Sequence, residues 1–161
     1  IEKQKIGQAI ACIDQKLNET QKIKRPQEQK NPVADYFLTE LKIRCASKKL
    51  EVLAAIELPQ SAGIDTLDFS TILSNMLDNA VKACEKVQGR RYIRLNIHKN
   101  GNILFIGCEN SKSTVQERSG SERKIGHFGL INIRKSAKKY GGTVEISEKS
   151  DNFLIEVLLY C

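Results

Sequence analysis

A segment with helical periodicity between residues 67 and 87 carries polar side chains whose types and spacing could bind a metal–phosphate group. At about 100° per residue, Asn75, Asn79 and Lys82 fall within about 60° of one another, roughly opposite an apolar stripe, and Asp78 flanks them. An asparagine oxygen suits Mg²⁺, which keeps several waters and phosphate oxygens, and a nearby lysine neutralises phosphate charge. The alternative is a plain solvated helix face that holds two amides.

A second candidate feature is the Gly126-x-x-Gly129 segment, which precedes a helix predicted from about Leu130. Glycines at this place let the backbone approach a phosphate, and the first turn of a helix offers free N–H groups and the positive end of its dipole. A plain tight turn explains the same glycines. The polar stretch 110–125 comes just before them, and we expect it to be mobile and to cover a ligand.

The elements that must position these residues follow from hydrophobic periodicity and turn signals. The periodicity predicts helices at about 31–48, 67–87 and 130–140. It predicts strands at 50–58, 91–98, 103–108, 143–148 and 153–160. Asn31-Pro32 predicts a helix start, Asn100-Gly101 a type I′ hairpin, and Gly141-Gly142 a helix end. The apolar run 103–108 suggests a central strand covered on both faces.

Two predicted hairpins exclude an all-parallel sheet. The fold class expected is therefore a two-layer α/β sandwich, with helices on one face of a mixed, largely antiparallel sheet. The chain has 161 residues, 40% of them hydrophobic, which suits one globular domain. No stretch reaches the ~20 apolar residues that a membrane helix needs.

The first 30 residues differ from the rest. Ile6, Ile10, Ile13 and Leu17 form a short coiled-coil-like seam, and a polar, proline-containing linker follows at 24–30. We expect 1–30 to be a partial helix with a linker and 31–161 to be the domain. Because the chain starts at Ile1, we expect it to be a fragment.

Charge and cysteine content narrow the class of protein. The net charge is +7, but the basic residues are spread out and aromatic residues are few, which argues against nucleic acid as a partner. The five cysteines form no CxxC pair, which indicates a reducing, cytoplasmic setting without a zinc site. Cys84 and Cys108 fall in apolar patterns and are predicted to be core thiols.

Two motifs at this spacing resemble those of a known superfamily. Residues 72–83, ILSNMLDNAVKA, resemble the N-box of the GHKL ATPases, the superfamily of DNA gyrase, MutL and the histidine kinases. Residues 126–133, GHFGLINI, resemble the glycine box that follows the ATP lid in histidine kinases, and 137–142 is similar to the end of that domain. The resemblance covers roughly 31–161 and implies the Bergerat fold, with ATP and Mg²⁺ as ligands.

The resemblance also implies roles for individual residues. Asn79 would coordinate Mg²⁺, Asn75 would contact Mg²⁺ or phosphate, and Lys82 would contact phosphate. It places the nucleotide site at Asn75, Asp78, Asn79, Lys82, Asn110, Gly126, His127, Phe128, Gly129 and Leu130. No residue of this chain is assigned as catalytic.

Within the superfamily the chain looks most like the Agr and VirS type of peptide quorum-sensing kinases. Most histidine kinases carry an Asp-x-Gly-x-Gly box whose Asp contacts adenine, whereas this chain has Asn110 and no glycines in the matching stretch 110–114. An asparagine oxygen can still accept a hydrogen bond from the adenine amino group. Thr71 stands where many relatives have an acidic residue.

The resemblance implies the catalytic ATP-binding domain of a sensor histidine kinase, which phosphorylates a histidine on a separate helical hairpin in two-component signalling. The implied partners are a response regulator and the hairpin of the same protein, in a homodimer whose cytoplasmic domain is anchored to a membrane sensor. Only His98 and His127 are present, and neither is expected to accept phosphate. The alternatives are a degenerate GHKL module that acts by protein contacts, and a GHKL serine kinase of the anti-sigma factor type.

Overall fold

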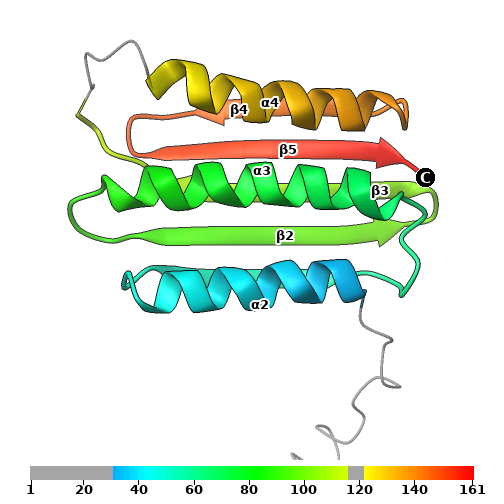
Figure 1. The fold of residues 1–161 in the computed structure, drawn as a ribbon, viewed down its shortest axis with the longest axis horizontal. Helices are drawn as coiled ribbons and strands as arrows, with labels where there is room; N and C mark the ends of the chain where they lie inside the picture. The colour runs from blue at the N-terminus through cyan, green and yellow to red at the C-terminus, as the bar shows by residue number, and fades with distance from the viewer. Residues whose placement is uncertain (1–30, 116–121) are drawn as a thin grey trace, which may run out of the picture.

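The fold has two layers, a five-stranded sheet with helices on one face (Figure 1). A computed structural model describes residues 31–115 and 122–161, with the backbone alone for 122–127. In chain order its elements are α2 (Pro32–Ala46), β1 (Glu51–Glu57), α3 (Thr66–Glu85), β2 (Tyr92–Asn100), β3 (Ile103–Ser111), α4 (Glu122–Lys138), β4 (Thr143–Glu148) and β5 (Asn152–Tyr160). The predicted seam at 6–17 and the linker at 24–30 lie outside the described residues.

The sheet is mixed, with the strand order β1-β2-β3-β5-β4. β1 pairs with β2 in parallel, and every other neighbouring pair is antiparallel. In Figure 1, α3 lies in the middle of the helical layer, between α2 and α4. The predicted two-layer α/β class with a largely antiparallel sheet is therefore confirmed.

The first described helix begins where the sequence predicts. The Asn31 side-chain oxygen accepts a hydrogen bond from the Ala34 backbone N–H at 3.1 Å, so Asn31 caps α2. Its side-chain nitrogen donates to the carbonyls of Pro59 and Gln60, at 3.3 and 3.1 Å. One buried amide thus caps α2 and fastens the start of the domain to the loop after β1.

The hairpin between β2 and β3 is present, but its predicted turn type is wrong. Asn100 pairs with Ile103, which leaves Gly101 and Asn102 as the two-residue loop. Gly101 has a φ of 58°, while Asn102 has no positive φ. A positive φ at the first loop residue alone is the pattern of a type II′ turn, because type I′ needs it at both.

The end of α4 confirms the prediction for Gly141-Gly142. Gly141 has a φ of 60° and donates to the Lys138 carbonyl at 3.1 Å, and Gly142 donates to the Ala137 carbonyl at 3.0 Å. These are the two hydrogen bonds of a Schellman motif. The motif turns the chain directly into β4.

The central strand β3 is covered by helices on one face only, so the expectation of cover on both faces is wrong. Leu104, Ile106 and Cys108 face the helices and are fully buried. On the other face Phe105 is half-buried and Ile103 is 38% exposed. Gly107, on this same face, lies against the Phe105 ring, and an added Cβ would approach the ring carbons to 3.0 Å.

The predicted core thiols are buried. Cys84 and Cys108 are both fully inaccessible, and burial raises the pKa of Cys108 to about 12. Among the described residues, the helices include none with both the length and the apolar content to cross a membrane.

Candidate functional site

The polar side of α3 meets α4 at a glycine. A Cβ built on Gly129 would lie 3.1 Å from the Asn75 Oδ1 and 3.2 Å from the Asn79 Nδ2. The Asn75 Nδ2 donates to the Thr71 carbonyl at 2.7 Å, which leaves its oxygen free to face α4. The structure therefore brings together both asparagines and one glycine of the two predicted motifs.

The burial of this pair differs from the sequence expectation. Asn75 and Asn79 are half-buried rather than on an open solvated face, because α4 packs beside them. Gly129 is buried, and a Cβ there would press on both asparagine side chains, which would have to shift by a few tenths of an ångström. Within the described residues the Asn79 amide makes no hydrogen bond, so it is available to a ligand.

The glycine segment itself lies inside a helix, not ahead of one. α4 begins at Glu122, so Gly126 and Gly129 occupy interior positions, and the predicted helix start near Leu130 is wrong. Each glycine destabilises a helix by about 1 kcal/mol. Two glycines alone are therefore not enough to prevent the helix from forming. Gly129 therefore does not present the free N–H groups of a first helical turn. Its contribution to the candidate site is its close approach to the two asparagines.

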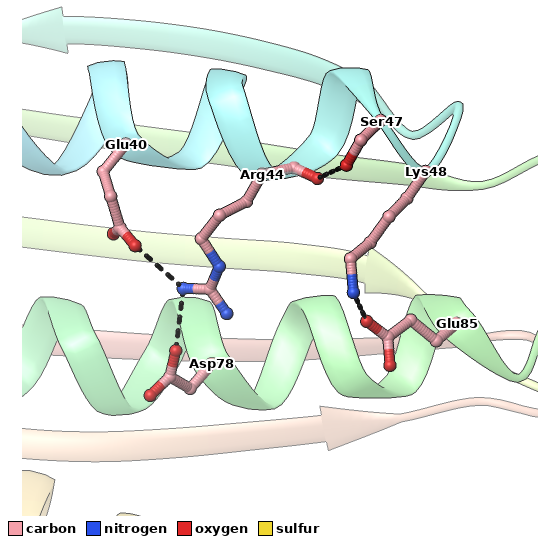
Figure 2. A network of polar contacts seen from close by, with 6 residues as sticks. All are labelled: Glu40, Arg44, Ser47, Lys48, Asp78 and Glu85. Carbon is pink, nitrogen blue, oxygen red and sulfur yellow. Dashed lines mark hydrogen bonds and ion pairs between the residues drawn. The ribbon is translucent and has the colours of Figure 1, made fainter.

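Asp78 lies on a different side of α3, toward α2. Its Oδ1 accepts from the Arg44 guanidinium at 2.8 Å, and Arg44 also reaches Glu40 at 3.5 Å (Figure 2). The hydrogen bond and charge of Asp78 raise the pKa of Arg44 against the opposing effect of burial, which is the largest single influence. A second cross-helix ion pair, Lys48–Glu85, lies further along the same interface.

The remaining predicted site residues are spread over three elements. Lys82 is exposed on α3, Phe128 is 66% exposed on α4, and Leu130 packs against the core. Asn110 is buried at the end of β3, 2% exposed, and its Nδ2 donates to the Ser111 carbonyl at 2.9 Å. The side chain of His127, like residues 116–121 of the expected lid, lies outside what the structure describes.

Sequence reasoning missed a polar cluster, centred on buried Asp68, that joins the start of α3 to the end of α4. Asp68 accepts from Lys139 at 2.7 Å and from the Tyr140 hydroxyl at 3.1 Å, and that hydroxyl accepts from the Asp65 N–H at 2.9 Å. The Lys139 hydrogen bond lowers the pKa of Asp68, with smaller lowering from Tyr140, while burial opposes both. The sequence indicates Asp65 as an N-cap. It does not indicate that Asp68 pairs with Lys139, which is 71 residues away.

This cluster predicts a pH dependence of stability. Since the folded-state pKa of Asp68 is lowered, its ionised form stabilises the fold above the unfolded pKa of about 3.9. That contribution is lost as the pH falls through the lower folded value. We expect Asp68→Asn to be less stable than the natural chain at pH 7, and the difference to shrink as the pH falls below about 3.9, towards the lower folded pKa.

Urea unfolding at a series of pH values measures both curves. The exposed Asp151→Asn is the matched control and should leave the pH profile unchanged. A constant gap between the Asp68→Asn and natural curves from pH 7 to pH 3 would show that the charge of Asp68 does not matter.

Comparisons with known proteins identify the family and the fold of the chain. A family model described as a GHKL domain matches residues 64–160, which is more than half of the chain. The chain belongs to the GHKL domain family. No curated protein sequence matches it significantly.

Solved structures show the same fold at low sequence identity. The nucleotide-free catalytic domain of the histidine kinase ThkA has a TM-score of 0.57 at 14% identity, over 79% of this chain and 91% of that one. The histidine kinase domain of the blue-light activated kinase EL346 from Erythrobacter litoralis gives 0.63 at 11%, over 84% and 65%. ShkA, solved in complex with AMPPNP, gives 0.61 at 16%, over 80% of this chain but 29% of ShkA.

The fold is thus that of histidine kinase catalytic domains, and the family is GHKL. The family match begins at residue 64, so α2 and β1 lie outside it. Asn75, Asn79 and Gly129 all lie inside it.

Proposed function

We propose that the chain binds Mg-ATP where α3 meets α4 and serves as the catalytic domain of a histidine kinase. The observation that carries the proposal is the contact of Gly129 with Asn75 and Asn79. It joins two segments more than 45 residues apart in sequence at the place where amide oxygens are free for a ligand. That ShkA was solved with AMPPNP supports ATP as the ligand.

The residues fit a magnesium–nucleotide complex. Asn79 and Asn75 would hold Mg²⁺ through their amide oxygens, a hard donor type that Mg²⁺ accepts. When bound, the metal would neutralise charge on the phosphate oxygens during transfer. Exposed Lys82, one turn beyond Asn79, would add a positive charge for the same phosphates, while Asp78 is engaged by Arg44.

Asn110 fits the adenine position in a specific way. Because its Nδ2 already donates to the Ser111 carbonyl, the Oδ1 is left as an acceptor. The adenine amino group is a donor, so the two match. Asparagine in place of the usual aspartate supports the narrower proposal of an Agr/VirS-type quorum-sensing kinase.

The phosphoryl acceptor in this proposal is a histidine on a separate helical hairpin, and the product passes to a response regulator. Of the two histidines in the chain, His98 stacks on Phe105, with ring centroids 4.9 Å apart, on the sheet face away from the helices. It therefore lies on the wrong side of the sheet to receive phosphate. The proposal extends to a homodimeric, membrane-anchored sensor with this domain in the cytoplasm.

The test has two arms. Calorimetric titration of the chain with ATP, with and without Mg²⁺, should show metal-dependent binding. Incubation with γ-labelled ATP and an extract of the source cells should label a protein with acid-labile phosphate, as expected of phosphohistidine. Acid-stable label would favour a serine kinase, and no nucleotide binding by a folded chain would favour a degenerate module.

Gly129→Ala separates binding from stability. The new Cβ would crowd both asparagine amides at 3.1–3.2 Å, so we expect ATP affinity to fall about tenfold, or ~1.4 kcal/mol. Alanine favours a helix over glycine by up to about 1 kcal/mol, so stability should stay close to that of the natural chain. Calorimetry and urea unfolding measure the two quantities, and unchanged affinity would place the nucleotide elsewhere.

A further inference from the structure

The sheet face that turns away from the helices, here called the open sheet face, is acidic although the chain carries a net charge of +7. Strand register places on it one arginine and five glutamates: Arg94, Glu51, Glu57, Glu109, Glu145 and Glu156. Among the described residues no helix covers this face (Figure 1). The basic surplus of the chain therefore lies elsewhere.

Three of these glutamates have no cationic partner among the described residues. Glu109 pairs with Arg94, and Glu51 pairs with Arg90. Glu57, Glu145 and Glu156 form no ion pair with any described residue. Glu145 stands directly opposite Glu156 across β4 and β5, an arrangement of like charges that destabilises a sheet unless a cation joins it.

The glutamate pair adjoins an apolar surface. Gly107 is the β3 neighbour of Glu156, and the Phe105 ring lies against it. Leu154 and Leu158 are half-buried beside them, and Tyr160 is 51% exposed. Such a surface suits the aliphatic stems of lysine and arginine, with their charged ends at the carboxylates.

The segment just before the domain has matching chemistry. Residues 22–30, KIKRPQEQK, contain Lys22, Lys24, Arg25 and Lys30 against one acid, Glu28. These residues lie outside the described part of the chain, but Asn31, to which they are attached, lies inside it. Because Asn31 is bonded to Pro59 and Gln60, the segment joins the domain beside the end of β1, where Glu57 lies.

The extended length of the segment exceeds the width of sheet that it has to cross. The seven residues from Lys24 to Asn31 span up to about 24 Å when extended. Three strand spacings separate β1 from β5 and four separate it from β4, which are offsets across the sheet of about 14 and 19 Å. A segment tethered this closely also has a high effective concentration at the face.

We propose that residues 22–30 dock in cis on the open sheet face, with Lys30 near Glu57 and the Lys24-Arg25 pair at Glu145 and Glu156. The docked segment neutralises the opposed carboxylates and covers the apolar surface around Phe105. The proposal does not depend on nucleotide binding.

Carbodiimide coupling tests it, because this reagent joins a carboxylate to a lysine amine only when the two are in contact. Applied to the whole 161-residue chain, it should link Lys22, Lys24 or Lys30 to Glu57, Glu145 or Glu156, as read by peptide mass spectrometry. The ion pairs Lys48–Glu85 and Lys112–Glu148 serve as internal positive controls. Mixing chains of light and heavy isotope distinguishes cis from trans.

A charge reversal sharpens the test. The variant E145K/E156K should reduce the links from Lys22 and Lys24 about tenfold, since repulsion replaces attraction. Adding K24E and R25E should restore links, now with the amine on the sheet. Circular dichroism checks that both variants fold.

Control links without any link to the three glutamates would overturn the proposal. Mixed-isotope links alone would also overturn it, in favour of a second copy of the chain as the occupant. If Lys22 and Lys24 of the E145K/E156K variant still form links to other acids in unchanged total yield, the contact does not depend on charge, and the role given to Glu145 and Glu156 is overturned.

Discussion

Asn79→Ala is expected to weaken Mg-ATP binding about 100-fold, equivalent to ~2.7 kcal/mol. In the proposed site the Asn79 amide oxygen is a metal ligand, and alanine supplies none. Asn79 is half-buried and makes no hydrogen bond within the described residues, so the free energy of unfolding should change by less than about 1 kcal/mol. Calorimetry with ATP and Mg²⁺ measures the affinity, and urea unfolding measures the stability.

Asn96→Ala is the matched control. Asn96 is an exposed asparagine on the open sheet face, so its loss should affect neither quantity. Equal affinity for Mg-ATP in the Asn79→Ala and Asn96→Ala variants would reject Asn79 as a metal ligand. A collapse of stability in Asn79→Ala would instead show that the polar side of α3 is needed for the fold.

Gly142→Ala is expected to lower the free energy of unfolding by about 3 kcal/mol, at the upper end of the usual cost of overpacking. A Cβ at this position would lie 2.3 Å from the Leu158 carbonyl oxygen and 3.0 Å from the Ala137 carbonyl oxygen. Both are backbone atoms, one in β5 and one in α4, so neither can move without disturbing its element. The melting temperature should fall by about 10 °C for a domain of this size.

Gly101→Ala is the control for conformational strain alone. Gly101 has a positive φ but no atom within 4 Å of an added Cβ, so its replacement should cost only about 1–2 kcal/mol. If the two alanine variants unfold at the same urea concentration, the close approach of α4 to β5 at Gly142 is looser than the structure shows. Thermal unfolding of the same pair gives an independent comparison.

Local sequence patterns predict much of the fold, because many helix ends and strands depend on residues that are close together in the sequence. The Asn31 cap, the alternation in β2 and the Gly141-Gly142 helix end each depend on residues a few positions apart. The start of α4 was mispredicted because the polar sequence after 110 and the glycines at 126 and 129 weaken a helical pattern, while the packing of α4 beside α3 favours it.

The sequence proposes residues for the candidate site but does not give their geometry. Helical spacing put Asn75 and Asn79 on one side of α3, but only the fold shows that Gly129 lies against them. The same spacing put Asp78 with them, whereas Arg44 from another helix engages it. Contacts of this kind depend on the order of strands and helices in space, which no local pattern contains.

The edge strand β1 has a consequence for how the domain opens. None of its seven residues is buried, whereas most of β3 is, so β1 and α2 should exchange their amide hydrogens before the sheet interior does. Their loss would break the Arg44–Asp78 pair and leave the Gly129 contact between α3 and α4 in place. The part of the domain formed by α2 and β1 can therefore loosen on its own, while the part that carries the asparagines remains folded.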